Sequence, residues 1–224
     1  NWTHAGIRLS NVNNGQLINN IVFRNNVTGV SLERSHSNTI FRNAITKNAF
    51  GGIELFMSRG NLISENNVSY NGGGGMRIYE GSGNTISGNN ISNNDGPGVI
   101  ISWDGENIIS GNIISNNERC GIGLITSFNN TITENLISYN YCGIYFAERS
   151  NESNNYIFDN IFTQNLKGKF RYEFDFLSEG IEYAISTLVF IFLILFALFY
   201  GIKKYRKRKH PIRRFRMEND SSNY

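Results

Sequence analysis

Histidine and cysteine are scarce in this chain of 224 residues, which has three histidines and two cysteines. His4, His36 and His210 are scattered along the sequence, so they do not indicate a catalytic triad or a metal site. The two cysteines have no histidine near them, which argues against a zinc-type site. The sequence therefore predicts no metal and no cofactor. A 3.6-residue apolar period is also missing from the first three quarters of the chain, which excludes amphipathic helices there.

What the chain does have is a repeat. One glycine precedes a short apolar-x-apolar stretch each time and recurs after 23 residues, or 22 in the last case: Gly6, Gly29, Gly52, Gly75, Gly98, Gly121 and Gly143. The apolar residues after it alternate with a period of two, which is typical of a strand with one buried face. Two more apolar positions recur, as Leu17, Ile40, Ile63, Ile86, Ile109, Ile132 and Ile157, and as Val22, Ile45, Val68, Ile91, Ile114, Ile137 and Phe162. Each repeat therefore predicts three short strands.

Asparagine fills two further columns of the repeat. One column is Asn20, Asn43, Asn66, Asn89, Asn112, Asn135 and Asn160, and the other is Asn25, Asn48, Asn71, Asn94, Asn117, Asn140 and Asn165. Asparagine tolerates left-handed backbone, and its side-chain amide bonds neighbouring main chain, so we expect it at tight corners between strands. Stacked corners of this kind form an asparagine ladder.

These columns predict an all-β solenoid, in which each coil of three strands pairs in parallel with the next at roughly 4.8 Å. About seven coils of 22–23 residues would stand on the order of 34 Å tall, with the aliphatic residues stacked inside. The pattern Gly-Ile-x-Leu…Asn-x-Ile-x-x-Asn-x-Ile-Ser-x-Asn resembles the repeats of the NosD-like and carbohydrate-active β-helix superfamily. The resemblance covers about residues 5–166 and implies a right-handed, single-stranded parallel β-helix.

The enzymatic signatures of that superfamily are missing from the sequence. Neither the paired aspartates and Gly-His-Gly of pectin hydrolases nor the Asp-Pro-His-Asp of alginate epimerases occurs. The carboxylates nearest to a glycosidase pair are Asp95, Asp104 and Glu106, and their surroundings are typical of turns. We therefore predict no catalytic residue. The scattered histidines also weaken the copper role that a resemblance to NosD would imply.

Outward positions on the strand after each repeat glycine form a candidate ligand-binding face. Arg8, Glu54 and Arg77 fall in one outward column, and Phe56 and Tyr79 fall in the next. Charged groups beside aromatic rings are what a sugar chain often lies across. The alternative is that Glu54 and Arg77 form a cross-rung ion pair worth under about 1 kcal/mol, and that the rings only cover the sheet.

The two cysteines precede the repeat glycine in adjacent coils, so we expect Cys120 and Cys142 to be stacked neighbours. A Cα separation near the strand spacing lies within the range of about 4.4 to 6.8 Å that a disulfide permits. The pair is therefore either a disulfide or a stack of reduced thiols in a core column. Side-chain direction decides between the two, and the sequence does not show it.

The chain changes character after residue 166. We expect the charged and aromatic residues 167–183 to cover the open end of the solenoid, to lie at a membrane surface, or both. Residues 184–202 carry no charge over 19 residues, long enough to cross about 30 Å of hydrocarbon, and predict a transmembrane helix. Residues 203–224 hold nine of the 21 basic residues, which predicts a cytoplasmic tail and an extracellular repeat domain, 1–166, on a single-pass membrane protein.

Charge is divided unevenly between these parts. Residues 1–183 carry 12 Lys and Arg against 16 Asp and Glu, a net of −4, whereas the tail carries nine against two. The formal net charge of +3 therefore comes from the tail and does not describe the repeat domain. For this reason the net charge does not indicate nucleic-acid binding, and we expect no nucleic-acid partner. We interpret the basic residues of the tail as a signal for membrane topology. The alternative is that they bind anionic lipid. The sequence begins in mid-repeat without an initiating methionine, and we expect further coils upstream.

Two functions remain. The first, which we favour, is a non-enzymatic cell-surface solenoid on a single membrane span that binds glycans or proteins or serves as an envelope scaffold. The second is a membrane-tethered carbohydrate-active lyase, epimerase or hydrolase whose catalytic coils lie partly outside this sequence. A cluster of acidic residues with Arg or Lys on one strand face would favour the enzyme, and this sequence has few residues of that kind on one face.

Overall fold

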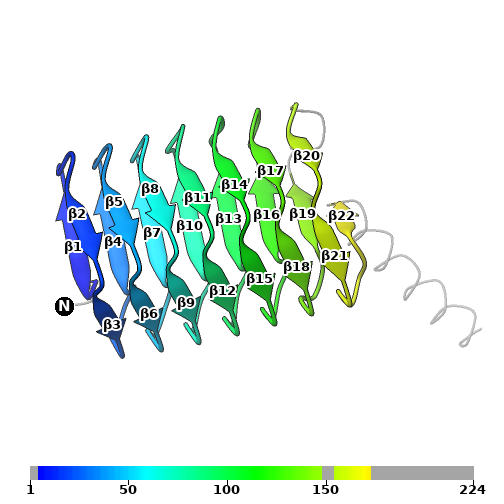
Figure 1. Cartoon of the computed structure of the whole chain (residues 1–224), viewed down its shortest axis with the longest axis horizontal. Helices are drawn as coiled ribbons and strands as arrows, with labels where there is room; N and C mark the ends of the chain where they lie inside the picture. The colour runs from blue at the N-terminus through cyan, green and yellow to red at the C-terminus, as the bar shows by residue number, and fades with distance from the viewer. Residues whose placement is uncertain (1–4, 148–153, 173–224) are drawn as a thin grey trace, which may run out of the picture. The chain divides into compact units, whose positions relative to one another are not determined.

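The computed structural model describes residues 5–147 and 154–172, which fold entirely into short strands and turns. Figure 1 shows the strands stacked in chain order as seven three-stranded coils, from β1–β3 to β19–β21, with one further strand, β22. Consecutive coils pair in parallel along three sheets. The expected parallel β-solenoid of about seven coils is confirmed.

Each sheet takes one strand from every coil. Sheet A contains β1 (Ile7–Ser10), β4 (Val30–Glu33), β7 (Ile53–Phe56), β10 (Met76–Tyr79), β13 (Val99–Ser102), β16 (Ile122–Ile125), β19 (Ile144–Ala147) and β22 (Phe170–Tyr172). Sheet B contains β2 (Gln16–Ile18), β5 (Thr39–Phe41), β8 (Leu62–Ser64), β11 (Thr85–Ser87), β14 (Ile108–Ser110), β17 (Thr131–Thr133) and β20 (Tyr156–Phe158). Sheet C contains β3 (Ile21–Phe23), β6 (Ala44–Thr46), β9 (Asn67–Ser69), β12 (Asn90–Ser92), β15 (Ile113–Ser115), β18 (Leu136–Ser138) and β21 (Ile161–Thr163).

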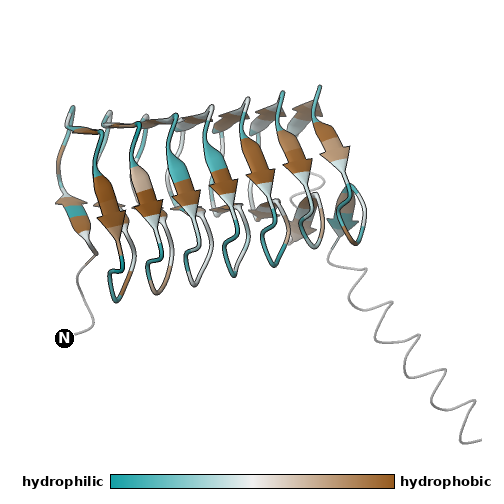
Figure 2. Cartoon of the chain, turned by 60° about the horizontal axis from the view of Figure 1, so that its bottom comes forward, coloured by the Kyte–Doolittle hydropathy of each residue, from teal (hydrophilic) through white to brown (hydrophobic). Residues whose placement is uncertain are grey.

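The core lies between the three sheets and consists of the apolar columns that the sequence predicts. In the middle coils the residues of these columns are fully buried, for example Ile63, Ile78 and Ile91, each 0% exposed. Figure 2 shows apolar segments, drawn in brown, within the strands of successive coils. Ile7 at one end and Phe162 at the other are only partly buried. Burial of one coil therefore depends on its neighbours, as expected for a solenoid.

The repeat glycine is required by a close approach of backbones. A Cβ atom on Gly75 would lie 2.4 Å from Cγ2 of Ile91 and 2.6 Å from the carbonyl oxygen of Gly98. Any side chain there would collide with the next coil. This explains why the 23-residue glycine column is unbroken through the first six coils.

The asparagine ladder is present and confirmed. Oδ1 of Asn89 accepts hydrogen bonds from the backbone N–H and the Nδ2 of Asn66, at 2.8 and 2.9 Å. Nδ2 of Asn89 donates to Oδ1 of Asn112 and to the carbonyl oxygens of Ile63 and Ser87, at 2.9 to 3.1 Å. The side chain is 1% exposed. Each ladder asparagine thus satisfies main-chain groups that the corner would otherwise leave unpaired.

The left-handed backbone of the corners lies one residue before the ladder. Glu65, with a φ of 53°, precedes Asn66, and Gly88, with a φ of 63°, precedes Asn89, whereas neither asparagine has a positive φ. The ladder asparagines are therefore selected for hydrogen bonding. The preceding position carries residues as different as Arg42, Glu65 and Gly111, because its side chain points to solvent.

A third asparagine column, which we did not predict, ends the turns between sheets A and B. Its members are Asn38, Asn61, Asn84, Asn107, Asn130 and Asn155. Each accepts a hydrogen bond from the backbone N–H of its counterpart in the preceding coil, as Asn84 does from Asn61 at 2.9 Å. An asparagine ladder therefore runs along all three corners of the coil. The ladder continues into coil seven, where Asn155 follows Asn130 by 25 residues and still accepts its backbone hydrogen bond.

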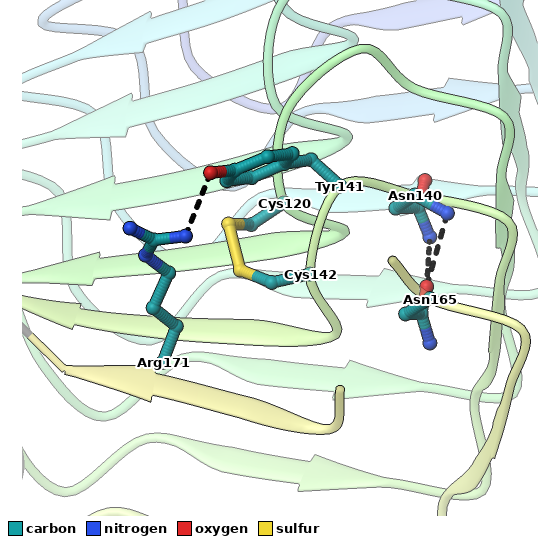
Figure 3. The surroundings of a disulfide bond; sticks show 6 residues. All are labelled: Cys120, Asn140, Tyr141, Cys142, Asn165 and Arg171. Atoms are coloured by element: carbon teal, nitrogen blue, oxygen red, sulfur yellow. Dashed lines mark hydrogen bonds between the residues drawn. A yellow bond between two sulfur atoms is a disulfide. The ribbon is translucent and has the colours of Figure 1, made fainter. Parts of the chain in front are cut away.

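The two cysteines form a disulfide between coils six and seven. Cys120 and Cys142 have Cα atoms 4.3 Å apart, and their sulfur atoms are bonded. Beside them the Arg171 guanidinium lies over the Tyr141 ring, 5.0 Å from its centroid, and donates to the Tyr141 hydroxyl at 2.7 Å (Figure 3). Of the two alternatives that the sequence left open, a disulfide or a stack of reduced thiols, the structure has the disulfide.

Strand pairing continues beyond the boundary that we expected at residue 166. β22 pairs with β19, with Phe170 opposite Ile144, because Phe170 and Tyr172 restore the apolar alternation of sheet A. Part of the expected capping segment is therefore an eighth strand of this sheet. The expected membrane span, 184–202, and the basic tail, 203–224, lie outside the described residues. Among those that are described, no helix is long and apolar enough to cross a membrane.

Candidate functional site

The outer surface of sheet A brings four of the five predicted ligand-binding residues together. Glu54 on β7 pairs in register with Arg77 on β10, and Phe56 pairs with Tyr79. The rings of Phe56 and Tyr79 stack with centroids 5.4 Å apart and planes 11° from parallel. These four residues line a shallow hollow of about 250 Å³, which we call the sheet hollow. Strand alternation explains the arrangement, since all four point away from the core.

The expected alternative, an ion pair between Glu54 and Arg77, is not present. In the described part of the chain the ion pairs are Arg8–Glu33, Arg34–Glu33 at 3.7 Å, and Arg42–Glu65 at 2.8 Å. Glu54 and Arg77 are adjacent in register, yet neither belongs to one of these pairs. Their charged groups can therefore still bind a ligand.

Arg8 belongs to the same surface but is already engaged. Its guanidinium pairs diagonally with Glu33 of the next coil, and this hydrogen bond holds the pKa of Glu33 below its ordinary value. The two residues line a second hollow of about 310 Å³ that also includes Glu54 and Phe56. This second hollow begins at coil one and adjoins the sheet hollow, because both are lined by Glu54 and Phe56.

A larger hollow, which we did not predict, lies over the turns that lead from sheet A to sheet B. We call it the turn hollow; its volume is about 490 Å³. Its lining comes from four consecutive coils and includes Arg59, Glu80, Trp103, Asp104, Glu106 and Phe128. Two aromatic rings, two exposed or half-buried glutamates and one arginine therefore surround the same space.

Asp104 is the buried carboxylate of the turn hollow. Its side chain is 5% exposed, and its two oxygens accept hydrogen bonds from the backbone N–H groups of Gly81, at 2.6 Å, and of Gly105, at 2.7 Å. Burial raises the pKa of Asp104 to about 6, although these hydrogen bonds and the charge of Arg59 act in the opposite direction. Asp104 therefore releases its proton at a much higher pH than an exposed aspartate.

The three carboxylates noted in the sequence do not form one group. Asp104 and Glu106 both line the turn hollow, together with Glu80, whereas Asp95 is exposed on a turn between sheets C and A. The sequence correctly placed Asp104 in a turn. It did not show that this aspartate is buried, because aspartate in a turn is normally exposed to water.

The described residues do not fit a copper site. In this part of the chain no three His, Cys, Asp or Glu side chains lie close enough together to hold a metal ion. Both cysteines are in the disulfide, and Nδ1 of His36 accepts a hydrogen bond from the backbone N–H of Arg59 at 3.1 Å. His4 and His210 lie outside the described residues.

The chain belongs to the right-handed β-helix family. The model of the right-handed β-helix region matches residues 51–175, which is more than half of the chain. A second model, the periplasmic copper-binding protein NosD, matches residues 1–71. A search of the curated proteins found no match.

Solved structures with a similar fold include enzymes that act on polysaccharides. The periplasmic alginate epimerase AlgG has a TM-score of 0.58 at 17% identity, over 70% of this chain and 42% of that chain. The A-module of the Azotobacter vinelandii mannuronan C-5 epimerase AlgE4 has a TM-score of 0.58 at 15% identity, over 73% and 55% of the two chains. At these identities the likeness extends to the fold, and this chain spans only about half of each relative.

Proposed function

We propose that this protein is a cell-surface β-helix that binds glycans on the outer surface of sheet A. The observation that carries the proposal is the sheet hollow, where Glu54 and Arg77 lie side by side without an ion pair next to the stacked rings of Phe56 and Tyr79. Support also comes from the fold, since the similar structures include epimerases of alginate and mannuronan, which are polysaccharides.

The chemistry of the four side chains suits a sugar. A carboxylate accepts hydrogen bonds from hydroxyl groups, and a guanidinium donates them, so Glu54 and Arg77 together can bond both sides of a vicinal diol. The polarised C–H groups on the face of a pyranose ring fit against the electron-rich face of an aromatic ring such as Phe56 or Tyr79. The hollow is shallow and continues toward Arg8, which suits a chain of sugars better than a single small molecule.

In this proposal the glycan-binding coils lie outside the cell. The apolar residues 184–202 would span the membrane, and the basic residues after them would remain in the cytoplasm. The role is then adhesion to glycans or organisation of the cell envelope, with no reaction at the sheet hollow.

A glycan array tests the proposal. We would purify the full chain in a detergent without a sugar headgroup and compare it with the double variant Arg77→Ala, Tyr79→Ala. The variant should lose binding by about tenfold or more, since it removes a charged hydrogen-bond donor and one stacking ring. The matched control is Phe41→Ala, Arg42→Ala, which removes the same kinds of side chain from sheet B, where Arg42 lies 4.6 Å over the Phe41 ring.

Two outcomes would contradict glycan binding at the sheet hollow. One is a protein that binds no glycan although its circular dichroism shows folded β-structure. The other is equal loss of binding in the sheet A variant and the sheet B control, since that would place the contact elsewhere or indicate a general effect on folding.

A second candidate function is carbohydrate turnover at the turn hollow. Asp104 favours it, because a carboxyl group with a pKa of about 6 is suited to general acid or base catalysis near neutral pH. Glu80 and Glu106 would supply the second carboxylate that glycoside hydrolysis requires. Release of new reducing ends or unsaturated sugars from a bound polysaccharide, abolished by Asp104→Asn, would favour this enzyme over the glycan-binding protein.

A further inference from the structure

The turn hollow differs from the sheet hollow in its location and its composition. It lies on the turns between sheets A and B, and its rings, Trp103 and Phe128, come from coils five and six. Trp103 is 56% exposed and Phe128 is 48% exposed, so both offer a large part of their surface to a ligand. Most solvent-exposed turns carry small polar residues, and two large exposed rings around one concave space are unusual.

Small residues in one column of the turns create the space. The column runs His36, Arg59, Ser82, Gly105 and Phe128, one residue per coil. Ser82 and Gly105 leave a gap between the long side chains of Arg59 and Phe128, which are three coils or about 14 Å apart. The Phe128 ring lies over Gly105, since a Cβ atom there would come within 2.6 Å of its Cε2 atom. The gap has the length of a short oligosaccharide segment.

We propose that the turn hollow is a second glycan-binding site, which takes a neutral saccharide with Trp103 and Phe128 as stacking surfaces. Glu80, Glu106 and Arg59 at its margin provide acceptors and donors for sugar hydroxyl groups. This site does not depend on the sheet hollow, because the two share no lining residue.

Charge and backbone pairing select the class of ligand. Three carboxyl groups and one guanidinium line the hollow, so an anionic uronate chain would be repelled and a neutral sugar would not. A peptide could not add to the sheet here, because the strands of sheet A on either side of the hollow are already paired with neighbouring coils. The open shape and the separated rings also do not form the continuous apolar groove that a helix needs.

Tryptophan fluorescence of the full chain tests this site directly. The chain has two tryptophans, so a Trp2→Phe background leaves Trp103 as the only reporter. We would titrate hexamers of glucose, mannose and N-acetylglucosamine, with a galacturonate hexamer as the anionic probe. At least one neutral hexamer should change the Trp103 emission at millimolar concentration or below, and the galacturonate hexamer should not.

Three variants in this background locate the binding. Phe128→Ser introduces the residue that coil four carries in the same column, and should weaken binding by about tenfold. Tyr70→Asn is the control for Phe128→Ser, because it also replaces a large exposed ring, 57% exposed at Tyr70 against 48% at Phe128, but lies on the turn between sheets C and A. Tyr70→Asn and the sheet hollow variant Arg77→Ala, Tyr79→Ala should bind as the background does.

The outcomes separate this site from the proposed function. Loss of the fluorescence change in Phe128→Ser alone supports the turn hollow, whatever the array shows for the sheet hollow. The proposal is overturned if no neutral hexamer changes the emission, if the galacturonate hexamer binds more tightly, or if Phe128→Ser binds as the background does. Loss in Arg77→Ala, Tyr79→Ala alone would also overturn it, because the ligand would then sit in the sheet hollow.

Discussion

Asp104 occupies a buried turn position of the repeat. In the second and third coils the same position is a serine, Ser35 and Ser58. Ser58 accepts a hydrogen bond from the Ser35 N–H at 3.0 Å, and Asp104 accepts one in the same way from the Gly81 N–H. The aspartate therefore keeps the hydrogen bond of the column but adds a carboxyl group that burial disfavours in its charged form.

The raised pKa of Asp104 predicts how stability depends on pH. The folded chain keeps this proton up to about pH 6, whereas the unfolded chain releases it near its ordinary value of 3.8. The folded state thus binds more protons between these values, so stability falls as the pH rises through this window, by up to about 3 kcal/mol. Asp104→Ser removes the group and restores the serine of the column.

Denaturant unfolding of the wild type and of Asp104→Ser at pH 4, 5, 6 and 7 checks this prediction. The variant should gain in free energy of unfolding relative to the wild type as the pH rises, and the difference should level off above about pH 6. Taking the difference removes the contributions of other groups, including Glu33, whose lowered pKa acts with the opposite sign. A difference that stays constant from pH 4 to 7 would show that Asp104 titrates normally.

Side-chain direction limits what the sequence could show about single residues. Strand alternation predicted that Glu54, Phe56, Arg77 and Tyr79 share a surface, and the register places them together. Alternation did not predict that Arg8 pairs diagonally with Glu33, because that contact depends on rotamers. The burial of Asp104 was equally hidden, since it depends on which turn residue points inward.

At the scale of elements, the two-residue corner between sheets B and C shows how the ladder stabilises the fold. Asn89→Ala would remove five hydrogen bonds and leave the buried backbone N–H of Asn66 without its acceptor. A buried unsatisfied group costs about 1–3 kcal/mol, so we expect a loss of about 3 kcal/mol or more in the free energy of unfolding. Urea unfolding followed by circular dichroism measures it.

The next residue in the chain is the matched control for this corner. Asn90 is exposed on the outer surface of β12, and Asn90→Ala should change the free energy of unfolding by less than about 0.5 kcal/mol. Equal losses in Asn89→Ala and Asn90→Ala would mean that the ladder hydrogen bonds do not account for the stability of the corner.

The strands and two of the three ladders could be predicted because they repeat with a fixed period. The columns of Ile40 and Ile45 recur without a break, so their burial in the inner coils follows from one coil. The third column, which includes Asn84, has the same 23-residue spacing, but it follows turns of variable composition and was overlooked. The turn hollow could not be predicted, because it results from the sizes of neighbouring turn residues in four coils.

At the scale of the whole molecule, each coil is stabilised by contacts with its neighbours, and beyond coil seven the described chain adds only one strand, β22, which pairs with β19. The core residues Ile157 and Phe162 of coil seven are only partly buried. The disulfide between Cys120 and Cys142 closes a 22-residue separation and ties this coil to the one before it. By the chain-entropy argument such a link contributes about 3 kcal/mol, and in a solenoid the effect should stay local.

Hydrogen exchange of the double variant Cys120→Ala, Cys142→Ala tests whether the disulfide acts locally. Amides of β19, β20 and β21 should exchange on the order of 100-fold faster than in the wild type, since about 3 kcal/mol of protection is lost there. Amides of β4 to β9, three or more coils away, should keep their rates because they contact other coils. Treatment with a reductant should reproduce the effect in the wild type and change nothing in the variant. Faster exchange throughout the chain would instead show that the coils unfold as one cooperative unit, and the local account of stability would then fail.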